Sequence, residues 1–216
     1  HRGLHDLAGN IIENTASAFT AAIDGQYGIE CDVQISADGE AMVYHDDTLG
    51  RLTEGSAALA AMPAAEIKQA PFKQTRDRIL TLGELCDLVA GRAPLVIEMK
   101  SRFDRDARLP QRVAAVLKNY AGPAAVMSFD PEQIIALGET APGLTRGIVA
   151  ERHYDHPEWA ALDQGQKAQL AHLLHFWRTR PHFIAYGVKD LPAAAPSLAR
   201  RALGLPLLTW TVRTPQ

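Results

Sequence analysis

The sequence places two carboxylates close together in a short apolar segment. Glu30 and Asp32 stand two residues apart in Gly28-Ile29-Glu30-Cys31-Asp32-Val33, so on an extended strand they share one face. Neighbouring carboxylates in an apolar strand repel each other and are costly to desolvate, and a bound divalent cation would relieve both effects. A solvated pair on an edge strand, or a salt-bridge site, is the alternative.

A third carboxylate repeats this pattern in a second apolar segment. Glu98 lies in Val96-Ile97-Glu98-Met99-Lys100, and Lys100 falls on the same face. Three carboxylates with waters suit a hard cation such as Mg²⁺ or Ca²⁺, whereas the lack of convergent cysteines argues against a structural zinc site. Lys100 would lower the pKa of Glu98 or hold an anionic ligand group beside the cation. A plain Glu98–Lys100 ion pair is the alternative.

Two histidines end extended segments. His1 stands in His1-Arg2-Gly3, and His45 in Tyr44-His45-Asp46-Asp47. A turn at residues 37–39 would bring His45 roughly opposite Glu30. Because imidazole titrates near neutral pH, two histidines beside a cation could serve as general acid and general base. Taken alone, a terminal histidine beside an arginine is more often a surface residue.

The elements that must position these residues alternate along the chain. Helices are predicted over residues 13–25, 82–90, 110–120, 131–140, 164–176 and 193–203. Strands are predicted over residues 27–36, 94–100, 124–129, 144–150, 182–187 and 206–212, with an antiparallel return at 41–45 after the Asp38-Gly39 turn. Strands that alternate with helices of this kind indicate βαβ units and a parallel sheet.

Eight such units make a (β/α)8 TIM barrel, which is the predicted α/β fold, with a β-hairpin after its second strand. The sequence supplies six of the parallel strands, so we expect the other two before His1 and after Gln216. Residues 1–216 would then be a single barrel domain truncated at both ends, which should not close stably alone. The competing open doubly wound sheet would carry a GxGxxG or P-loop after a strand, and the sequence has neither.

Aromatic residues end two of the predicted strands. Phe129 and Trp210 therefore fall at the face of the barrel that carries active sites, where we expect them to line the pocket, with core packing as the alternative. Trp159, Phe176 and Trp177 lie in a histidine-rich stretch, residues 151–181, and could cover the barrel mouth or an interface.

Composition excludes several classes of protein. Of the 216 residues 47% are hydrophobic, and 22 Lys+Arg against 25 Asp+Glu give a formal net charge of −3. That balance argues against a nucleic-acid-binding protein, and the sequence holds no apolar run long enough for a membrane span. Two cysteines outside any CxxC pair are expected to be free thiols in a cytoplasmic protein; a periplasmic or secreted location stays open because the N-terminus looks trimmed.

Taken in order, the motifs resemble the glycerophosphodiester phosphodiesterase family of PLC-like phosphodiesterases. The resemblance spans essentially the whole chain and is densest through residue 100. It rests on His1-Arg2-Gly3, Glu13-Asn14-Thr15, Glu30-x-Asp32, His45-Asp46, Arg51-x-Thr53-x-Gly55 and Glu98-x-Lys100, with Trp210-Thr211-Val212 near the end.

The resemblance implies an enzyme, a metal-dependent phosphoric diester hydrolase that cleaves glycerophosphodiesters to glycerol 3-phosphate and an alcohol, and so a place in glycerol and lipid metabolism. Its site residues carry over one by one. Glu30, Asp32 and Glu98 would hold a divalent metal (Mg²⁺ or Ca²⁺, with Mn²⁺ as a third option), His1 and His45 would be the acid/base pair, Arg2 and Lys100 would contact the phosphate, and Glu13 would brace the site from behind.

Some positions depart from the family pattern. Ile12 stands where members commonly have Pro, Arg213 stands where Asn or a small polar residue is expected, and residues 151–181 have no counterpart. The expected partner is a small-molecule phosphodiester, and the oligomeric state stays open. A lysophospholipase D-like phosphodiesterase and a barrel that binds a ligand without turnover are the alternatives. The presence of both histidines and all three acids favours the hydrolase.

Overall fold

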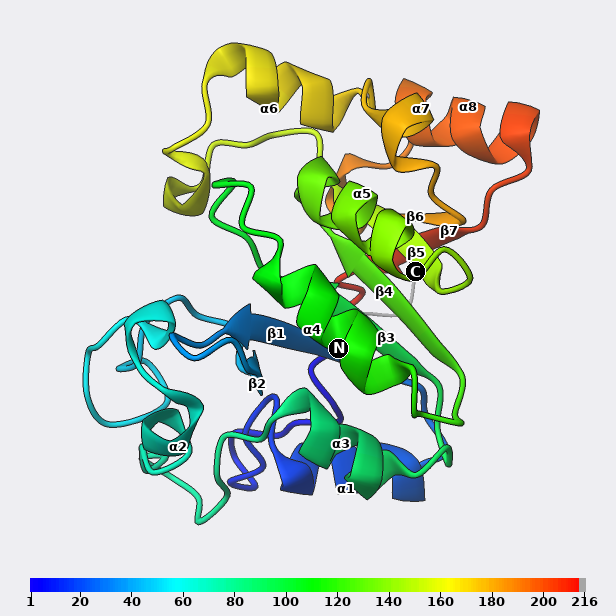
Figure 1. Cartoon of the computed structure of the whole chain (residues 1–216). Helices are drawn as coiled ribbons and strands as arrows, with labels where there is room; N and C mark the ends of the chain where they lie inside the picture. The colour runs from blue at the N-terminus through cyan, green and yellow to red at the C-terminus, as the bar shows by residue number, and fades with distance from the viewer. Residues whose placement is uncertain (214–216) are drawn as a thin grey trace.

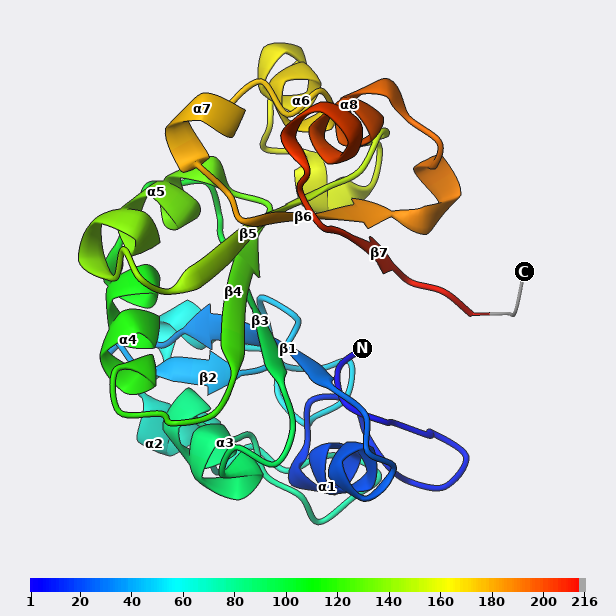
Figure 2. The ribbon, with the colours of Figure 1, turned by 90° about the vertical axis from the view of Figure 1, so that its right-hand side faces the viewer.

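One curved sheet organises the chain in the computed structural model, which describes residues 1–213 (Figures 1 and 2). The strands are β1 (Ile29–Ile35), β2 (Ala41–Val43), β3 (Leu95–Met99), β4 (Ala124–Ser128), β5 (Thr145–Ala150), β6 (Phe183–Gly187) and β7 (Leu207–Trp210). They lie in the order β2-β1-β3-β4-β5-β6-β7, and only the β1–β2 pair is antiparallel. The six predicted parallel strands and the hairpin are confirmed, and within residues 1–213 the sheet does not close into a barrel.

Helices fill the connections between the parallel strands and lie along the outer side of the sheet (Figure 2). They are α1 (Ala16–Asp24), α2 (Ala64–Ile67), α3 (Leu82–Val89), α4 (Arg108–Leu117), α5 (Pro131–Thr140), α6 (Gln164–Ala171), α7 (Phe176–Thr179) and α8 (Ala194–Leu203), with short 3₁₀ turns at Leu59–Ala61, Pro157–Trp159 and Val188–Asp190. Their first turns explain where several begin. Thr81 and Glu84 form a capping box for α3, and Asp130 caps α5, which has Pro131 in its first turn.

The two faces of each strand serve different purposes. Side chains on the outer face, such as Cys31 and Ile97, are fully buried against the helices in the main hydrophobic core. Inner-face residues of the later strands, Met127, Val149 and Phe183 among them, form a smaller apolar cluster inside the curve of the sheet. Gly147 makes room for it, because a Cβ there would lie 2.3 Å from the Phe183 ring. On the same inner side, β1 carries Glu30, Asp32 and Gln34, and β3 carries Val96 followed by Glu98.

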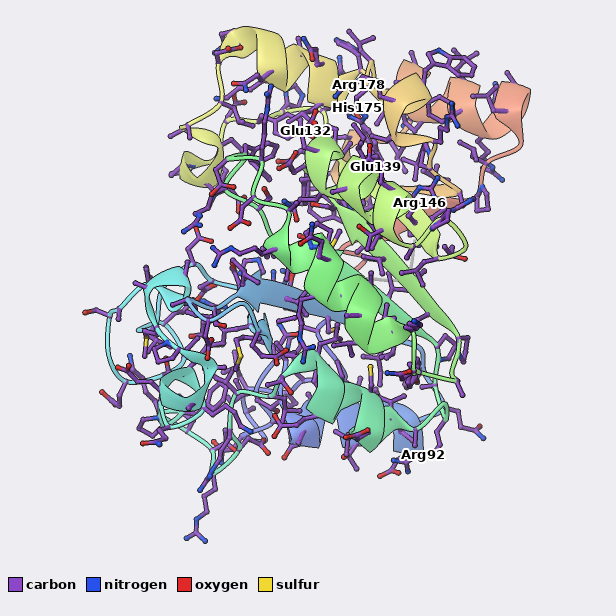
Figure 3. The ribbon with its side chains drawn as sticks, in the orientation of Figure 1. Arg92, Glu132, Glu139, Arg146, His175 and Arg178 are labelled. Atoms are coloured by element: carbon purple, nitrogen blue, oxygen red, sulfur yellow. The ribbon has the colours of Figure 1, made fainter. Side chains whose placement is uncertain are left out.

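The predicted helix over residues 164–176 is wrong, because the chain turns between α6 and α7. Leu173 takes the left-handed conformation (φ 56°) and buries its side chain in the main core. Tertiary packing thus outweighs local helix propensity. Arg178 of α7 then pairs with Glu132 of α5 at 2.8 Å (Figure 3), which ties the short helix to its neighbour.

The hairpin is shorter than predicted, and its register differs. β2 ends at Val43, which pairs with Val33, and Tyr44 N donates to Asp32 O at 3.1 Å. Continuing that register puts His45 level with Cys31, one residue short of Glu30. None of the helices in residues 1–213 combines the length and the apolarity that crossing a bilayer requires.

Truncating a core side chain should test this assignment of faces. Leu85 is fully buried in α3, whereas Leu198 in α8 is 66% exposed. We expect Leu85→Ala to lower the free energy of unfolding by about 2–5 kcal/mol, because it leaves a cavity, and Leu198→Ala by less than about 0.5 kcal/mol. Urea unfolding followed by circular dichroism measures both changes, and equal losses would contradict the assignment.

Candidate active site

Adjacent parallel strands bring the three predicted metal-binding carboxylates together. Asp32 of β1 is the register partner of Glu98 of β3, and Glu30 precedes Asp32 on the same face. Ligand oxygens of the three side chains lie within 4.8 Å of one another. Asp32 and Glu98 are buried and Glu30 is half-buried. The strand alternation predicted from sequence therefore yields one compact acidic cluster.

The charges of this cluster are only partly balanced. Burial, reinforced by Asp32 and Glu98, raises the pKa of Glu30 to about 8. Burial also raises the pKa of Glu98, because it outweighs the opposing effect of Lys100. Lys100 does act to lower the pKa of Glu98, as expected from the sequence, but the pKa is raised overall because burial has the larger effect.

Asp32 is the carboxylate that stays charged. Burial acts to raise its pKa, but Lys100, His45 and Arg2 lower it to about 2. Lys100 Nζ lies 2.9 Å from Asp32 Oδ1 and also pairs with Glu98. The three carboxyl groups share only two cationic side chains, Lys100 and Arg2, and such a set of clustered oxygen ligands suits a hard divalent cation.

The Glu13-Asn14-Thr15 segment holds the cluster from behind. Asn14 is buried, adopts the left-handed conformation (φ 57°) that asparagine tolerates, and donates from Nδ2 to Asp32 Oδ2 at 2.9 Å. Thr15 caps α1 and donates to the carbonyl of Ile12 at 2.7 Å. One tripeptide therefore starts a helix and orients a candidate metal ligand, a role for Asn14 that the spacing alone did not predict.

The N-terminal His1-Arg2-Gly3 segment lies against the end of β1. Arg2 N donates to Glu30 Oε2 at 2.9 Å, and Gly3 N donates to the Glu30 carbonyl at 3.1 Å. Gly3 has φ 77°, and a Cβ there would lie 2.9 Å from the backbone of Ala18. Only glycine permits this close approach, which delivers Arg2 to the acidic cluster.

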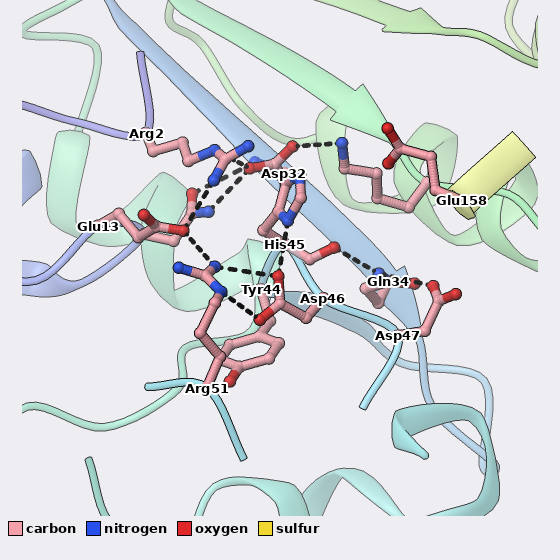
Figure 4. Close-up of polar contacts among 12 residues, drawn as sticks. Arg2, Glu13, Asp32, Gln34, Tyr44, His45, Asp46, Asp47, Arg51 and Glu158 are labelled. Carbon is pink, nitrogen blue, oxygen red and sulfur yellow. Dashed lines mark hydrogen bonds and ion pairs between the residues drawn. The ribbon is translucent and has the colours of Figure 1, made fainter. Parts of the chain in front are cut away.

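A chain of alternating charges connects Arg2 with His45 (Figure 4). Arg2 pairs with Glu13 at 2.8 Å, and the same Glu13 oxygen lies 2.6 Å from Arg51. Arg51 in turn contacts both oxygens of Asp46, at 2.6 and 2.9 Å. Asp46 Oδ1 lies 2.7 Å from His45 Nδ1.

This chain of charges fixes the imidazole. Burial acts to raise the pKa of Asp46, but His45 and Arg51 lower it to about 2, so Asp46 is a carboxylate that only accepts hydrogen bonds. The proton of a neutral His45 ring is therefore on Nδ1, and Nε2 is able to accept one. The sequence analysis gave Asp46 and Arg51 no role. Asp46 follows a candidate catalytic histidine directly in the sequence, and this position could have indicated that it orients the ring.

These groups line one cavity of about 580 Å³. Among the predicted site residues it is lined by His1, Arg2, Glu13, Glu30, His45, Glu98, Lys100, Phe129 and Trp210, while the buried Asp32 lies behind its pairs with Arg2 and Lys100. The structure thus brings all ten predicted site residues together. Trp159 also lines the cavity, as expected for a residue at the mouth, but Phe176 and Trp177 do not, and Trp177 is 76% exposed on the outer side.

Aromatic rings form one wall of this cavity. The Phe129 ring lies 4.8 Å from that of Trp159 and 5.6 Å from that of Trp210, between centroids, and Phe103 lies 6.2 Å from Trp159. Trp210 Nε1 is buried and has no hydrogen-bond partner within residues 1–213. The wall therefore offers a ligand an apolar surface together with one N–H donor, Trp210 Nε1.

Glu151 is a cavity residue that the sequence analysis missed. It follows directly after β5, at the strand end where barrel active sites lie, and it accepts a hydrogen bond from Trp159 Nε1 at 2.6 Å. Burial, assisted by Glu158 and Asp190, raises its pKa to about 7. Its position at a strand end was a signal that the sequence did offer.

Comparison with known sequences identifies the family of this chain. A family model described as "Glycerophosphoryl diester phosphodiesterase family" matches residues 1–216. A glycerophosphodiester phosphodiesterase of Caldanaerobacter subterraneus subsp. tengcongensis is 31% identical over 163 residues, which are 71% of this chain and 67% of that protein. A probable glycerophosphodiester phosphodiesterase 1 of Mycobacterium tuberculosis is 25% identical over 149 residues. These residues are 62% of this chain and about half (54%) of the Mycobacterium protein.

Solved structures show the same fold. An Oleispira antarctica phosphodiesterase in complex with the product sn-glycerol-3-phosphate superposes with a TM-score of 0.78 at 21% identity, covering 99% of this chain and 83% of that one. Glycerophosphodiester phosphodiesterase from Thermotoga maritima gives 0.71 at 24% identity, covering 100% and 85%. The predicted TIM-barrel class is confirmed, and with the family model matched from end to end, the chain belongs to the glycerophosphoryl diester phosphodiesterase family.

Proposed function

We propose that the chain hydrolyses glycerophosphodiesters to glycerol 3-phosphate and an alcohol, using a divalent cation and two histidines. One observation carries this proposal: the acidic cluster, two cationic side chains and both histidines lie at a single cavity. The related phosphodiesterase structure that contains sn-glycerol-3-phosphate supports the same product here.

Glu30, Asp32 and Glu98 would hold the cation. The fit rests on the chemistry of the cluster, which has three oxygen donors within 4.8 Å and fewer positive charges than negative ones. Mg²⁺, Ca²⁺ and Mn²⁺ all accept such a donor set. When bound, the cation would neutralise the phosphodiester charge and polarise its phosphorus–oxygen bonds.

Arg2 and Lys100 would bind the phosphodiester beside that cation. Lys100 is held between Asp32 and Glu98, so its ammonium is fixed at the carboxylate cluster. Arg2 Nε lies 3.2 Å from Asp32 Oδ2, yet it is buried and makes no hydrogen bond within residues 1–213. A buried guanidinium N–H that makes no hydrogen bond within residues 1–213 suits a phosphate oxygen, whose charge grows in the transition state.

His1 and His45 would move the protons. With its Nδ1 proton directed at Asp46, His45 presents Nε2 either to accept a proton or, once protonated, to donate one. One histidine would remove the proton of the attacking oxygen, from water or the neighbouring glycerol hydroxyl, and the other would protonate the departing alcoholate. Asp46, held by Arg51, would orient the His45 ring.

Phe129 and Trp210 would contact the glycerol end. Both lie at strand ends on the aromatic wall, and the unpaired Trp210 Nε1 offers a donor for a substrate hydroxyl.

Removing a candidate metal ligand should abolish divalent-dependent activity and leave the protein folded. We expect Glu30→Ala or Asp32→Ala to lower turnover of glycerophosphocholine by at least about 100-fold, because the cation site loses an anionic ligand. Glycerol 3-phosphate release, with and without EDTA and each added metal, measures the effect, and circular dichroism checks the fold. Turnover that resists EDTA would refute the metal assignment.

Truncating His45 should separate proton transfer from metal binding. We expect His45→Ala to lower kcat by about 100-fold or more, and Asp46→Asn by about 10-fold, because an amide can donate to Nδ1 and so favour the other tautomer. Divalent-metal affinity, measured by calorimetry, should change far less than kcat in His45→Ala. Asp87→Asn, an exposed acid on α3, is the matched control. Wild-type turnover in His45→Ala would remove His45 from the acid/base role.

Trp210 should act on substrate binding. We expect Trp210→Ala to raise KM for glycerol-containing substrates by about 10-fold and to leave the metal requirement unchanged, because the ring and its free donor contact the glycerol. Steady-state kinetics on glycerophosphocholine measures the change. An unchanged KM would place Trp210 in the core instead.

A further inference from the structure

We propose that Glu151 and the aromatic rings beside it form a subsite for the leaving alcohol, one that selects a cationic headgroup such as an amino alcohol. This proposal rests on the function proposed above and names its substrate class. The residues involved are Glu151, Trp159 and Phe103, with Phe129 at the boundary to the phosphate site.

Glu151 is held in place and retains an unused oxygen. Its Oε1 accepts the hydrogen bond from Trp159 Nε1, and Oε2 makes none within residues 1–213. The facing strand leaves space for it. A Cβ at Gly187 would lie 3.4 Å from Asp190 Oδ2 and 3.6 Å from Glu151 Cβ, so glycine there keeps this strand end open beside both acidic side chains. Glu151 therefore presents one carboxylate oxygen to the cavity that it lines.

The charge of Glu151 lacks a partner. Glu13 and Asp46 pair with Arg51, and Asp32 and Glu98 pair with Lys100, whereas Glu30 belongs to the candidate metal cluster. In the part of the chain that the structure describes, Glu151 makes no salt bridge, and its charged neighbours include the carboxylates Glu158 and Asp190 as well as His156. A half-buried carboxylate is costly to ionise without a cation, so this position favours a ligand that supplies one.

Aromatic faces complete the recognition of a cation. Trp159 packs against Phe129 at 4.8 Å and Phe103 at 6.2 Å, and all three rings line the cavity with Glu151. Ammonium groups, and quaternary ones above all, bind to ring faces beside a carboxylate. An apolar or neutral alcohol could pack against the rings but would form no ion pair with the Glu151 carboxylate.

The distance across the sheet suits a headgroup attached to the phosphate. Glu98 lies near the end of β3 and Glu151 just past the end of β5, with β4 between them. Two strand spacings amount to about 10 Å. A phosphodiester held by Arg2 and Lys100 could thus place an ammonium, two carbons beyond the ester oxygen, near Glu151. Arg213 lines the same cavity and would favour the opposite class, an anionic headgroup.

Substrate discrimination tests the subsite in the full chain. The panel is glycerophosphocholine and glycerophosphoethanolamine against the uncharged headgroups of glycerophosphoglycerol and glycerophosphoinositol. Glu151→Gln removes the charge and keeps an acceptor for Trp159 Nε1. We expect it to lower kcat/KM for the two cationic substrates by about 10-fold and for the neutral ones by less than about twofold. Glu139→Gln, the same change on the exposed end of α5 (Figure 3), should alter neither class.

Several outcomes would overturn the proposal. An equal loss on all four substrates would assign Glu151 to glycerol binding or to folding, and no loss would remove it from recognition. A wild-type preference for neutral or anionic headgroups that disappears in Arg213→Ala would give the subsite to Arg213.

A binding measurement separates this proposal from the activity itself. Choline is titrated against tryptophan fluorescence, since Trp159 and Trp210 line the cavity and the third tryptophan, Trp177, lies on the outer side. We expect saturable binding to the wild type and about 10-fold weaker binding to Glu151→Gln, with glycerol as the neutral control. Choline binding without turnover of any diester would refute the proposed function and leave the subsite standing. Turnover of glycerophosphodiesters without choline binding would refute the subsite and leave the proposed function standing.

Discussion

The buried carboxylate of Asp32 is the group on which the rest of the site depends. Ionised inside the sheet, it requires a hydrogen-bond donor and positive charge around it, and the chain supplies both from three directions: Asn14, Lys100 and Arg2. Each comes from a different part of the sequence. The N-terminal segment, the residues before α1 and the end of β3 therefore all contact a single carboxylate.

A series of ion pairs connects the acidic cluster with His45. Starting at Arg2, positive and negative side chains alternate through Glu13, Arg51 and Asp46 until they reach the imidazole. Each acid in that series has a partner, which keeps the network rigid without hydrophobic packing. Glu30 and Glu98 differ, since burial and the charge of Asp32 raise their pKa values. Glu151 differs because it makes no salt bridge within residues 1–213. The acids without a full set of cationic partners are thus the ones for which a cation and a cationic headgroup are proposed above.

Sequence periodicity was sufficient for the strands and for the acidic cluster. A two-residue spacing puts Glu30 and Asp32 on one face whatever the surroundings, and a parallel sheet then brings Glu98 alongside. Periodicity could not locate the break between α6 and α7, because it depends on Leu173 turning into a core built by distant residues. Nor could it show that Arg51 bridges Glu13 and Asp46, since ion pairs across 38 positions leave no local signature.

The position of Glu13 between two guanidinium groups also constrains how the sequence can evolve. Because Arg2 and Arg51 share one carboxylate oxygen, losing Glu13 would leave two like charges facing each other, whereas losing either arginine would still leave a matched pair. The effects of the three substitutions are thus not independent. Glu13 could be lost without this repulsion only after one of the two arginines had changed, so the order of mutations, and not only their identity, affects which variants are reachable.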